Sequence, residues 1–116
     1  MIKRHTISFK NAFRGLAWAI KTQPNFKIHL ILSFVALAAS YYLSISYGEL
    51  LIILTFIAIG LALEAVNTAF ELTTDAIDVK WREDIGLAKD VAAGAMLIFS
   101  IMAVAVSLII FVPKIV

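Results

Sequence analysis

Three apolar stretches of about 20 residues constrain this chain more than any other feature. They cover residues 28–47, 50–70 and 91–112. A helix of ~20 residues crosses the ~30 Å hydrocarbon core of a bilayer, so each stretch is long enough to span a membrane. Composition agrees, because 62% of the residues are hydrophobic and the mean hydropathy is +0.97. The sequence therefore predicts an all-α membrane protein with three transmembrane helices.

The polar composition excludes several other classes of protein. We expect residues 1–116 to form a single domain, because the sequence holds no internal repeat and no low-complexity linker. Cysteine is absent, and His5 and His29 lack metal-ligand spacing, so neither a disulfide nor a zinc site is expected. The net charge is only +2, with the basic residues beside the apolar spans. This pattern favours anionic lipid over nucleic acid as the partner.

Residues 5–22 have the pattern of an amphipathic helix that lies on the membrane surface. Apolar residues recur at spacings of four, three and four, in Phe9, Phe13, Leu16 and Ile20. Basic residues share another face, in Lys10, Arg14 and Lys21. These periods place the two sets on different sides of a helix of 3.6 residues per turn, as in interfacial helices. The alternative is a disordered basic tail. Pro24 should end the helix, because proline disfavours helical geometry at the preceding Gln23.

The distribution of lysine and arginine predicts the orientation in the membrane. Six precede the first span, in Lys3, Arg4, Lys10, Arg14, Lys21 and Lys27. Three lie between the second and third spans, in Lys80, Arg82 and Lys89, whereas the C-terminal end has only Lys114. The positive-inside rule therefore predicts a multi-pass protein with the N-terminus and the loop between the second and third spans in the cytoplasm.

A stripe of polar side chains ends the second span. Spacings of three, four and four place Glu64, Asn67, Glu71 and Asp75 on one face of a helix. Counting from Glu49 at the outer boundary, the helical rise places Glu64 about 22 Å into the membrane, within the inner leaflet. A carboxylate at such depth costs roughly 2.5–3.5 kcal/mol, which favours a functional role. The alternative is a protonated or hydrogen-bonded Glu64 that serves assembly only.

The third span begins beside this stripe with Lys89 and Asp90. A cation there could bind phosphate, and carboxylate oxygens could bind magnesium. The alternative for this pair is snorkelling by Lys89 and helix capping by Asp90. The sequence contains no Gly-x-x-x-x-Gly-Lys-Ser/Thr loop and no Ser/His/Asp set. Any use of ATP therefore does not follow the design of soluble kinases.

Two motifs resemble those of a known family. They are Glu-Ala-Val-Asn-Thr-Ala-Phe-Glu-Leu-Thr-Thr-Asp at residues 64–75 and Ala-Lys-Asp-Val-Ala-Ala-Gly-Ala at residues 88–95. Together, at this separation, they resemble the prokaryotic diacylglycerol kinase and undecaprenol kinase family. Phe13-Arg14-Gly15-Leu16, Asn25-Phe26-Lys27-Ile28-His29 and Phe111-Val112-Pro113-Lys114 extend the resemblance and are more similar to the undecaprenol kinase branch.

The resemblance implies an ATP-dependent lipid kinase of the bacterial inner membrane, a homotrimer that uses Mg²⁺ and phosphorylates undecaprenol or diacylglycerol. Glu64 would be the catalytic base, and Glu71 would bind metal and phosphate. The nucleotide site would comprise Asn67, Glu71, Asp75, Lys89, Asp90 and Arg4. The family usually has a second metal-binding residue, a Glu, at the position of Gln23 in this chain. The amide oxygen of Gln23 could coordinate a metal, but it brings no charge.

Two other functions are compatible with an acidic residue in a span. A small proton- or ion-coupled transporter would use such a residue near the membrane midplane. Here the polar stripe instead continues toward the cytoplasm, which disfavours a transporter. A non-enzymatic assembly or regulatory subunit would fold without nucleotide or metal.

Overall fold

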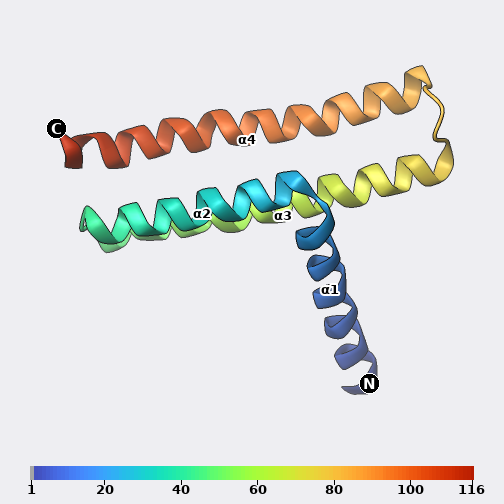
Figure 1. The fold of residues 1–116 in the computed structure, drawn as a ribbon, viewed down its shortest axis with the longest axis horizontal. Coiled ribbons are helices and arrows are strands. Elements are labelled where there is room, and N and C mark those ends of the chain that lie inside the picture. Colours follow the sequence, from blue (N-terminus) through green and yellow to red (C-terminus); the bar gives the residue numbers. More distant parts are fainter. Residues whose placement is uncertain (1) are drawn as a thin grey trace.

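Four helices account for nearly all of residues 2–116, which are the residues that the computed structural model describes. They are α1 (Ile2–Thr22), α2 (Pro24–Tyr42), α3 (Tyr47–Ile77) and α4 (Glu83–Ile115), and no strand occurs in this range. α2, α3 and α4 lie alongside one another, with α3 antiparallel to both neighbours (Figure 1). α3 packs against both α2 and α4. The all-helical class predicted from the sequence is confirmed.

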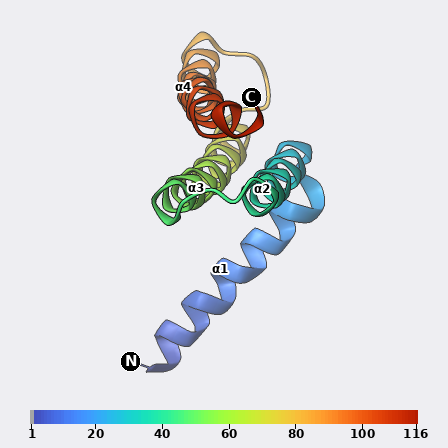
Figure 2. The ribbon, with the colours of Figure 1, turned by 90° about the vertical axis from the view of Figure 1, so that its left-hand side faces the viewer.

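The first helix turns away from the other three at the predicted break. α1 ends at Thr22, Gln23 is extended with φ −101° and ψ 112°, and Pro24 begins α2. Proline fits this first helical position because its missing N–H would have no partner there. α1 then runs crosswise to the direction shared by α2, α3 and α4 (Figures 1 and 2). This arrangement suits a surface helix, although its position on a membrane remains a prediction.

α3 and α4 are the two helices that are long and apolar enough to cross a membrane, among those of residues 2–116. Their bounds enclose the predicted spans 50–70 and 91–112. α2 has 19 residues, which gives a length of about 28 Å, but its first turns contain Asn25, Lys27 and His29. A membrane crossing by α2 therefore remains a prediction.

The turn between α2 and α3 shortens the first predicted span. α2 ends at Tyr42 rather than at residue 47, and Ser44 adopts a left-handed φ of 51°. Ser46 then caps α3: its hydroxyl accepts a hydrogen bond from the Glu49 N–H at 3.1 Å, and the Glu49 carboxylate accepts one from the Ser46 N–H at 3.0 Å. This capping box fixes where α3 begins. The apolar pattern of the sequence did not predict this turn, because the turn itself contains the apolar residues Leu43 and Ile45.

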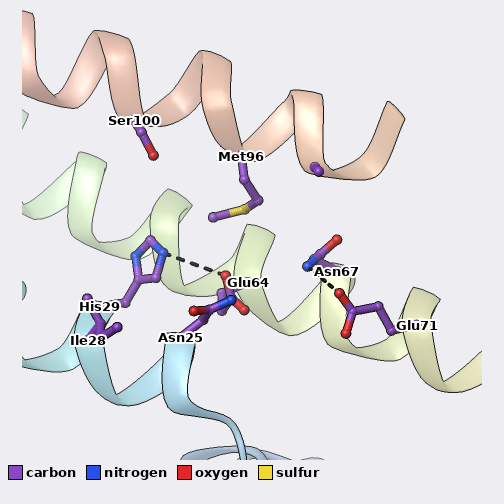
Figure 3. A pocket seen from close by; sticks show the side chains of 9 residues that line it. Asn25, Ile28, His29, Glu64, Asn67, Glu71, Met96 and Ser100 are labelled. Atoms are coloured by element: carbon purple, nitrogen blue, oxygen red, sulfur yellow. Dashed lines mark hydrogen bonds and ion pairs between the residues drawn. The ribbon is translucent and has the colours of Figure 1, made fainter. Parts of the chain in front are cut away.

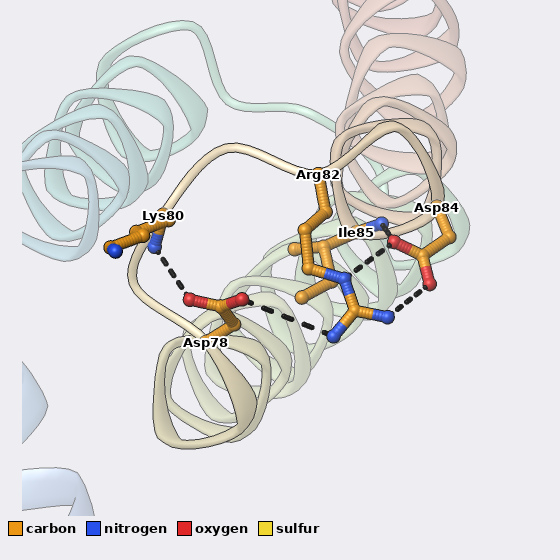
Figure 4. A network of polar contacts seen from close by, with 5 residues as sticks. All are labelled: Asp78, Lys80, Arg82, Asp84 and Ile85. Carbon is orange, nitrogen blue, oxygen red and sulfur yellow. Dashed lines mark hydrogen bonds and ion pairs between the residues drawn. The ribbon is translucent and has the colours of Figure 1, made fainter.

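Polar side chains order the opposite connection, between α3 and α4 (Figure 4). The Arg82 guanidinium donates to both oxygens of Asp84, at 3.2 and 2.8 Å, and lies 4.0 Å from Asp78. Asp78 accepts a hydrogen bond from the Lys80 N–H at 2.9 Å. The Asp84 carboxylate also accepts a hydrogen bond from the backbone N–H of Ile85 at 2.8 Å, in the first turn of α4. These contacts hold the loop in a defined shape between the two long helices.

Candidate active site

The polar stripe of α3 passes from a buried to an exposed environment along the helix. Glu64 is only 4% exposed, Asn67 is half-buried and Glu71 is exposed. The i, i+3 and i+4 spacings bring these side chains to one face, as the sequence predicts. The Asn67 amide donates a hydrogen bond to the Glu71 carboxylate at 3.3 Å, which joins successive turns of the stripe.

A cavity of about 280 Å³ lies over this face, between α2, α3 and α4 (Figure 3). Its lining consists of Asn25, Ile28, His29, Glu64, Asn67, Glu71, Ala93, Met96 and Ser100. Carboxylates, amides, an imidazole and a hydroxyl therefore share one space. Such a grouping of polar atoms in a concave site is typical of a binding or catalytic site.

His29 approaches Glu64 from α2. The Nε2 atom of His29 lies 3.6 Å from Oε2 of Glu64 (Figure 3). The side chain of Glu64 is 5% exposed and that of His29 is 21% exposed. Sequence reasoning did not assign a role to His29. The available signal was an ionisable residue within an apolar stretch, which usually has a function.

A second, apolar cavity adjoins the first. It has a volume of about 460 Å³, and His29 and Ser100 line both cavities. Most of its other lining residues are aliphatic or aromatic, and among them are Leu32, Ile57 and Phe99. The polar cavity therefore borders an apolar one at the level of His29.

Asp75 and Lys89 form an ion pair between α3 and α4. The Lys89 ammonium lies 2.7 Å from the Asp75 carboxylate. Both side chains are partly exposed, at 38% for Lys89 and 54% for Asp75. The structure thus brings together two of the predicted nucleotide-site residues, although neither lines the cavity around Glu64.

Three other predicted site residues lie outside that cavity. The Gln23 amide donates to the Thr22 hydroxyl at 3.2 Å at the junction of α1 and α2. Asp90 is exposed on α4. Arg4 is exposed near the start of α1, where its carbonyl accepts a hydrogen bond from Ser8. The chain by itself therefore does not bring Gln23 to the cavity that Glu71 lines.

The cavity carries the donor chemistry that a hard cation needs. Two carboxylates, Glu64 and Glu71, and two amides, Asn25 and Asn67, line it. Magnesium prefers oxygen ligands and is usually held by one or two carboxylates together with substrate phosphates. Within residues 2–116, no group of three acidic, histidine or cysteine side chains is placed to hold a metal alone. The residues present thus suit a metal that binds together with a phosphate ligand, and Glu71 is the carboxylate best exposed to hold it.

Comparison with known proteins gives one consistent family. The sequence profile described as prokaryotic diacylglycerol kinase matches residues 10–111. The undecaprenol kinase of Bacillus subtilis is 34% identical over 113 residues, which are 97% of this chain and 92% of that protein. A diacylglycerol kinase of Synechocystis is 33% identical over 86% of this chain and 58% of its own length. A diacylglycerol kinase of Haemophilus influenzae is 26% identical over 78% of this chain and 77% of its own length.

The family match includes the whole of α2 and α3, which line the polar cavity, together with most of α1 and α4. It also includes Glu64, Asn67 and Glu71, which share that cavity. The relatives on both branches are named as kinases of lipid alcohols, in agreement with the resemblance of residues 64–75 and 88–95. The chain belongs to the prokaryotic diacylglycerol kinase family and is a lipid kinase.

Proposed function

We propose that this protein transfers the terminal phosphoryl group of ATP to the primary hydroxyl of a membrane lipid alcohol, with undecaprenol favoured over diacylglycerol. The preference for undecaprenol rests on the Bacillus subtilis relative, which is named undecaprenol kinase and covers 97% of this chain. In the reaction, the lipid oxygen loses its proton and bonds to phosphorus, and the bond from phosphorus to the ADP oxygen breaks.

The burial of Glu64 inside the polar cavity is the observation that carries this proposal. Glu64 is 4% exposed and faces the space lined by Asn67 and Glu71. His29 lies five residues after Pro24, and the rise of a helix places it about 8 Å along α2 from the junction with α1. Glu64 lies 3.6 Å from His29 and therefore at a similar depth. With α1 on the membrane surface, Glu64 lies just below that surface. A lipid hydroxyl can reach that depth without leaving the bilayer.

Each predicted residue then has a defined task. Glu64 accepts the hydroxyl proton as the general base. Glu71 would hold Mg²⁺, which would offset negative charge on the phosphates. The remaining nucleotide contacts would come from Asn67, Asp75, Lys89, Asp90 and Arg4, and Gln23 would offer an amide oxygen to the metal.

The cellular setting follows from the same proposal. The protein crosses the bacterial inner membrane three times, with its N-terminus in the cytoplasm, where ATP is present. It assembles as a homotrimer. Assembly would allow residues that lie outside the cavity of a single chain, such as Gln23 and Arg4, to approach a neighbouring chain's site.

Phosphate transfer by the purified protein tests the proposed function. The full chain in detergent micelles receives radiolabelled ATP and Mg²⁺ with undecaprenol, with diacylglycerol, or with no lipid, at matched mole fractions. We expect label in the lipid extract, more with undecaprenol than with diacylglycerol, and none when the divalent metal is chelated. Absence of lipid labelling with both alcohols would overturn the proposed function, and faster labelling of diacylglycerol would overturn the substrate preference.

A further inference from the structure

We propose that His29 is a positioning residue for Glu64, holding one carboxylate oxygen so that the other faces the cavity. This inference rests on the proposed function, because it assigns Glu64 the task of accepting a proton from the lipid alcohol. His29 does not touch the reacting atoms in this account. It acts through the orientation of the Glu64 carboxylate.

The contact between the two residues joins separate helices. Nε2 of His29, on α2, lies 3.6 Å from Oε2 of Glu64, on α3. Within residues 2–116 this is the one ion pair that Glu64 makes. A carboxylate that is 5% exposed has little water to solvate it, so a nearby imidazole N–H is worth more there than at the surface.

The imidazole ring is itself held in place by an aromatic neighbour. The ring centroids of His29 and Phe99 are 6.3 Å apart, and Phe99 in turn lies 5.8 Å from Phe56. A Cβ added at Gly60 would lie 2.6 Å from the Phe99 ring and 3.6 Å from Nδ1 of His29. The Phe99 ring therefore occupies space that only glycine at residue 60 leaves free, and the His29 ring lies at van der Waals distance from the same position.

Gly60 and Glu64 are four residues apart, so they lie on the same face of α3, one turn apart. The His29 ring thus packs over Gly60 on its Nδ1 side and directs its Nε2 side toward Glu64 (Figure 3). The ring thus contacts Gly60 and Phe99 on one edge and the Glu64 carboxyl group on the other. This is the arrangement needed to orient a second group, because positioning requires a rotamer that is itself locked.

The location of His29 explains why orientation matters at this point. His29 lines both the polar cavity and the apolar one. A lipid alcohol arriving from the apolar side would bring its hydroxyl past His29 to Glu64. A misplaced carboxylate would then lose the proton-transfer geometry, and an error of ~1 Å can cost on the order of 100-fold in rate.

A matched set of substitutions tests the proposal in the full chain. In size and reach, the amide nitrogen of glutamine mimics Nε2 of histidine, whereas that of asparagine mimics Nδ1. We expect His29→Leu and His29→Asn to lower kcat by on the order of 10- to 100-fold, with the KM for MgATP within about twofold of wild type. His29→Gln should retain most of the activity. His5→Leu, which changes the other, exposed histidine, is the control.

A double mutant separates positioning from a general effect on folding. If His29 acts through Glu64, His29→Leu should cause no further loss when added to Glu64→Gln. Equal activity of the glutamine and asparagine variants, or full multiplicative loss in the double mutant, would overturn the proposal. If His29→Leu does not fold, the kcat of His29→Gln compared with that of His29→Asn tests the proposal instead. Failure of wild-type protein to phosphorylate any lipid alcohol would instead refute the proposed function.

Discussion

Glu64 is a carboxylic acid residue that is only 4% exposed, and it lies in α3, a helix that is long and apolar enough to cross a membrane. Seven residues further along the same stripe, Glu71 is exposed and accepts a hydrogen bond from Asn67. Two carboxylates on one face thus have different surroundings. Burial suits Glu64 to proton transfer with a lipid, and exposure suits Glu71 to binding a hydrated cation and phosphate.

The proposed difference between the two carboxylates predicts different kinetics. Glu71→Gln should raise the KM for MgATP as well as lower kcat, because it removes a charged ligand from the metal and phosphate site. Steady-state kinetics with varied MgATP at saturating lipid provide the measurement. An unchanged KM for MgATP would exclude Glu71 from that site.

A substitution of Gln23 is expected to increase the affinity for the metal. Gln23→Glu should lower the Mg²⁺ concentration that gives half-maximal activity, because a carboxylate binds a hard cation more tightly than an amide does. The Thr22 hydroxyl accepts a hydrogen bond from the Gln23 amide and donates its own proton to the Trp18 carbonyl at 2.8 Å, so it has no second proton to donate to a carboxylate at residue 23. A magnesium titration of both proteins measures the effect. An identical titration would mean that residue 23 does not contribute to the metal site.

Residue patterns predicted part of this site. The spacing of Glu64, Asn67 and Glu71 was enough to place them on one face, because helical periodicity is local. The approach of His29 to Glu64 was not predictable, since it depends on how α2 packs against α3. That packing brings the His29 ring against Gly60, and the spacing of the two residues along the chain does not reveal their contact.

At the scale of the helices, the close approach of α4 to α3 depends on Gly60. Gly60→Ala should lower the free energy of unfolding by about 1–3 kcal/mol, the usual cost of overpacking, because its Cβ would lie 2.6 Å from the Phe99 ring. Denaturant titration in detergent micelles measures this. Gly15→Ala is the matched control, since nothing lies within 4 Å of its added Cβ. Equal stability of the two variants would contradict the packing at Gly60.

Helix boundaries were predictable where a specific residue determines them. Pro24 ends α1 because of its effect on Gln23, and the break falls where the sequence predicts it. The apolar pattern predicts an end of α2 that is too late, because Leu43 and Ile45 continue that pattern through the turn. The capping box of Ser46 and Glu49 was the signal that could have corrected it.

The molecule as a whole has two chemically different ends. The loop between α3 and α4 carries Lys80 and Arg82 at one end (Figures 1 and 4). At the other end, the turn between α2 and α3 lies near the C-terminus (Figure 1), and Lys114 of α4 pairs with Glu49 of α3 at 3.4 Å. The positive-inside rule predicts that the first end lies in the cytoplasm, and this orientation stays a prediction.

Chemical labelling tests this orientation. The chain has no cysteine, so a single introduced thiol gives an unambiguous signal. Val79→Cys, at a site that is 84% exposed, should react with a membrane-impermeant maleimide only after the cells are opened. Tyr42→Cys, 83% exposed beside the α2–α3 turn, should react in intact cells. The reverse result would place the polar stripe on the side without ATP.

The rate of lipid phosphorylation by Glu64→Gln shows whether Glu64 is the catalytic base. Glutamine keeps the shape and hydrogen-bonding capacity of Glu64 but cannot accept the proton, so kcat should fall by about 100-fold or more while nucleotide affinity stays close to wild type. Glu49→Gln is the matched control, because glutamine also completes a capping box and Glu49 lies at the opposite end of α3. It should retain wild-type turnover. If Glu64→Gln also turns over a saturating lipid alcohol at the wild-type rate, Glu64 is not the catalytic base.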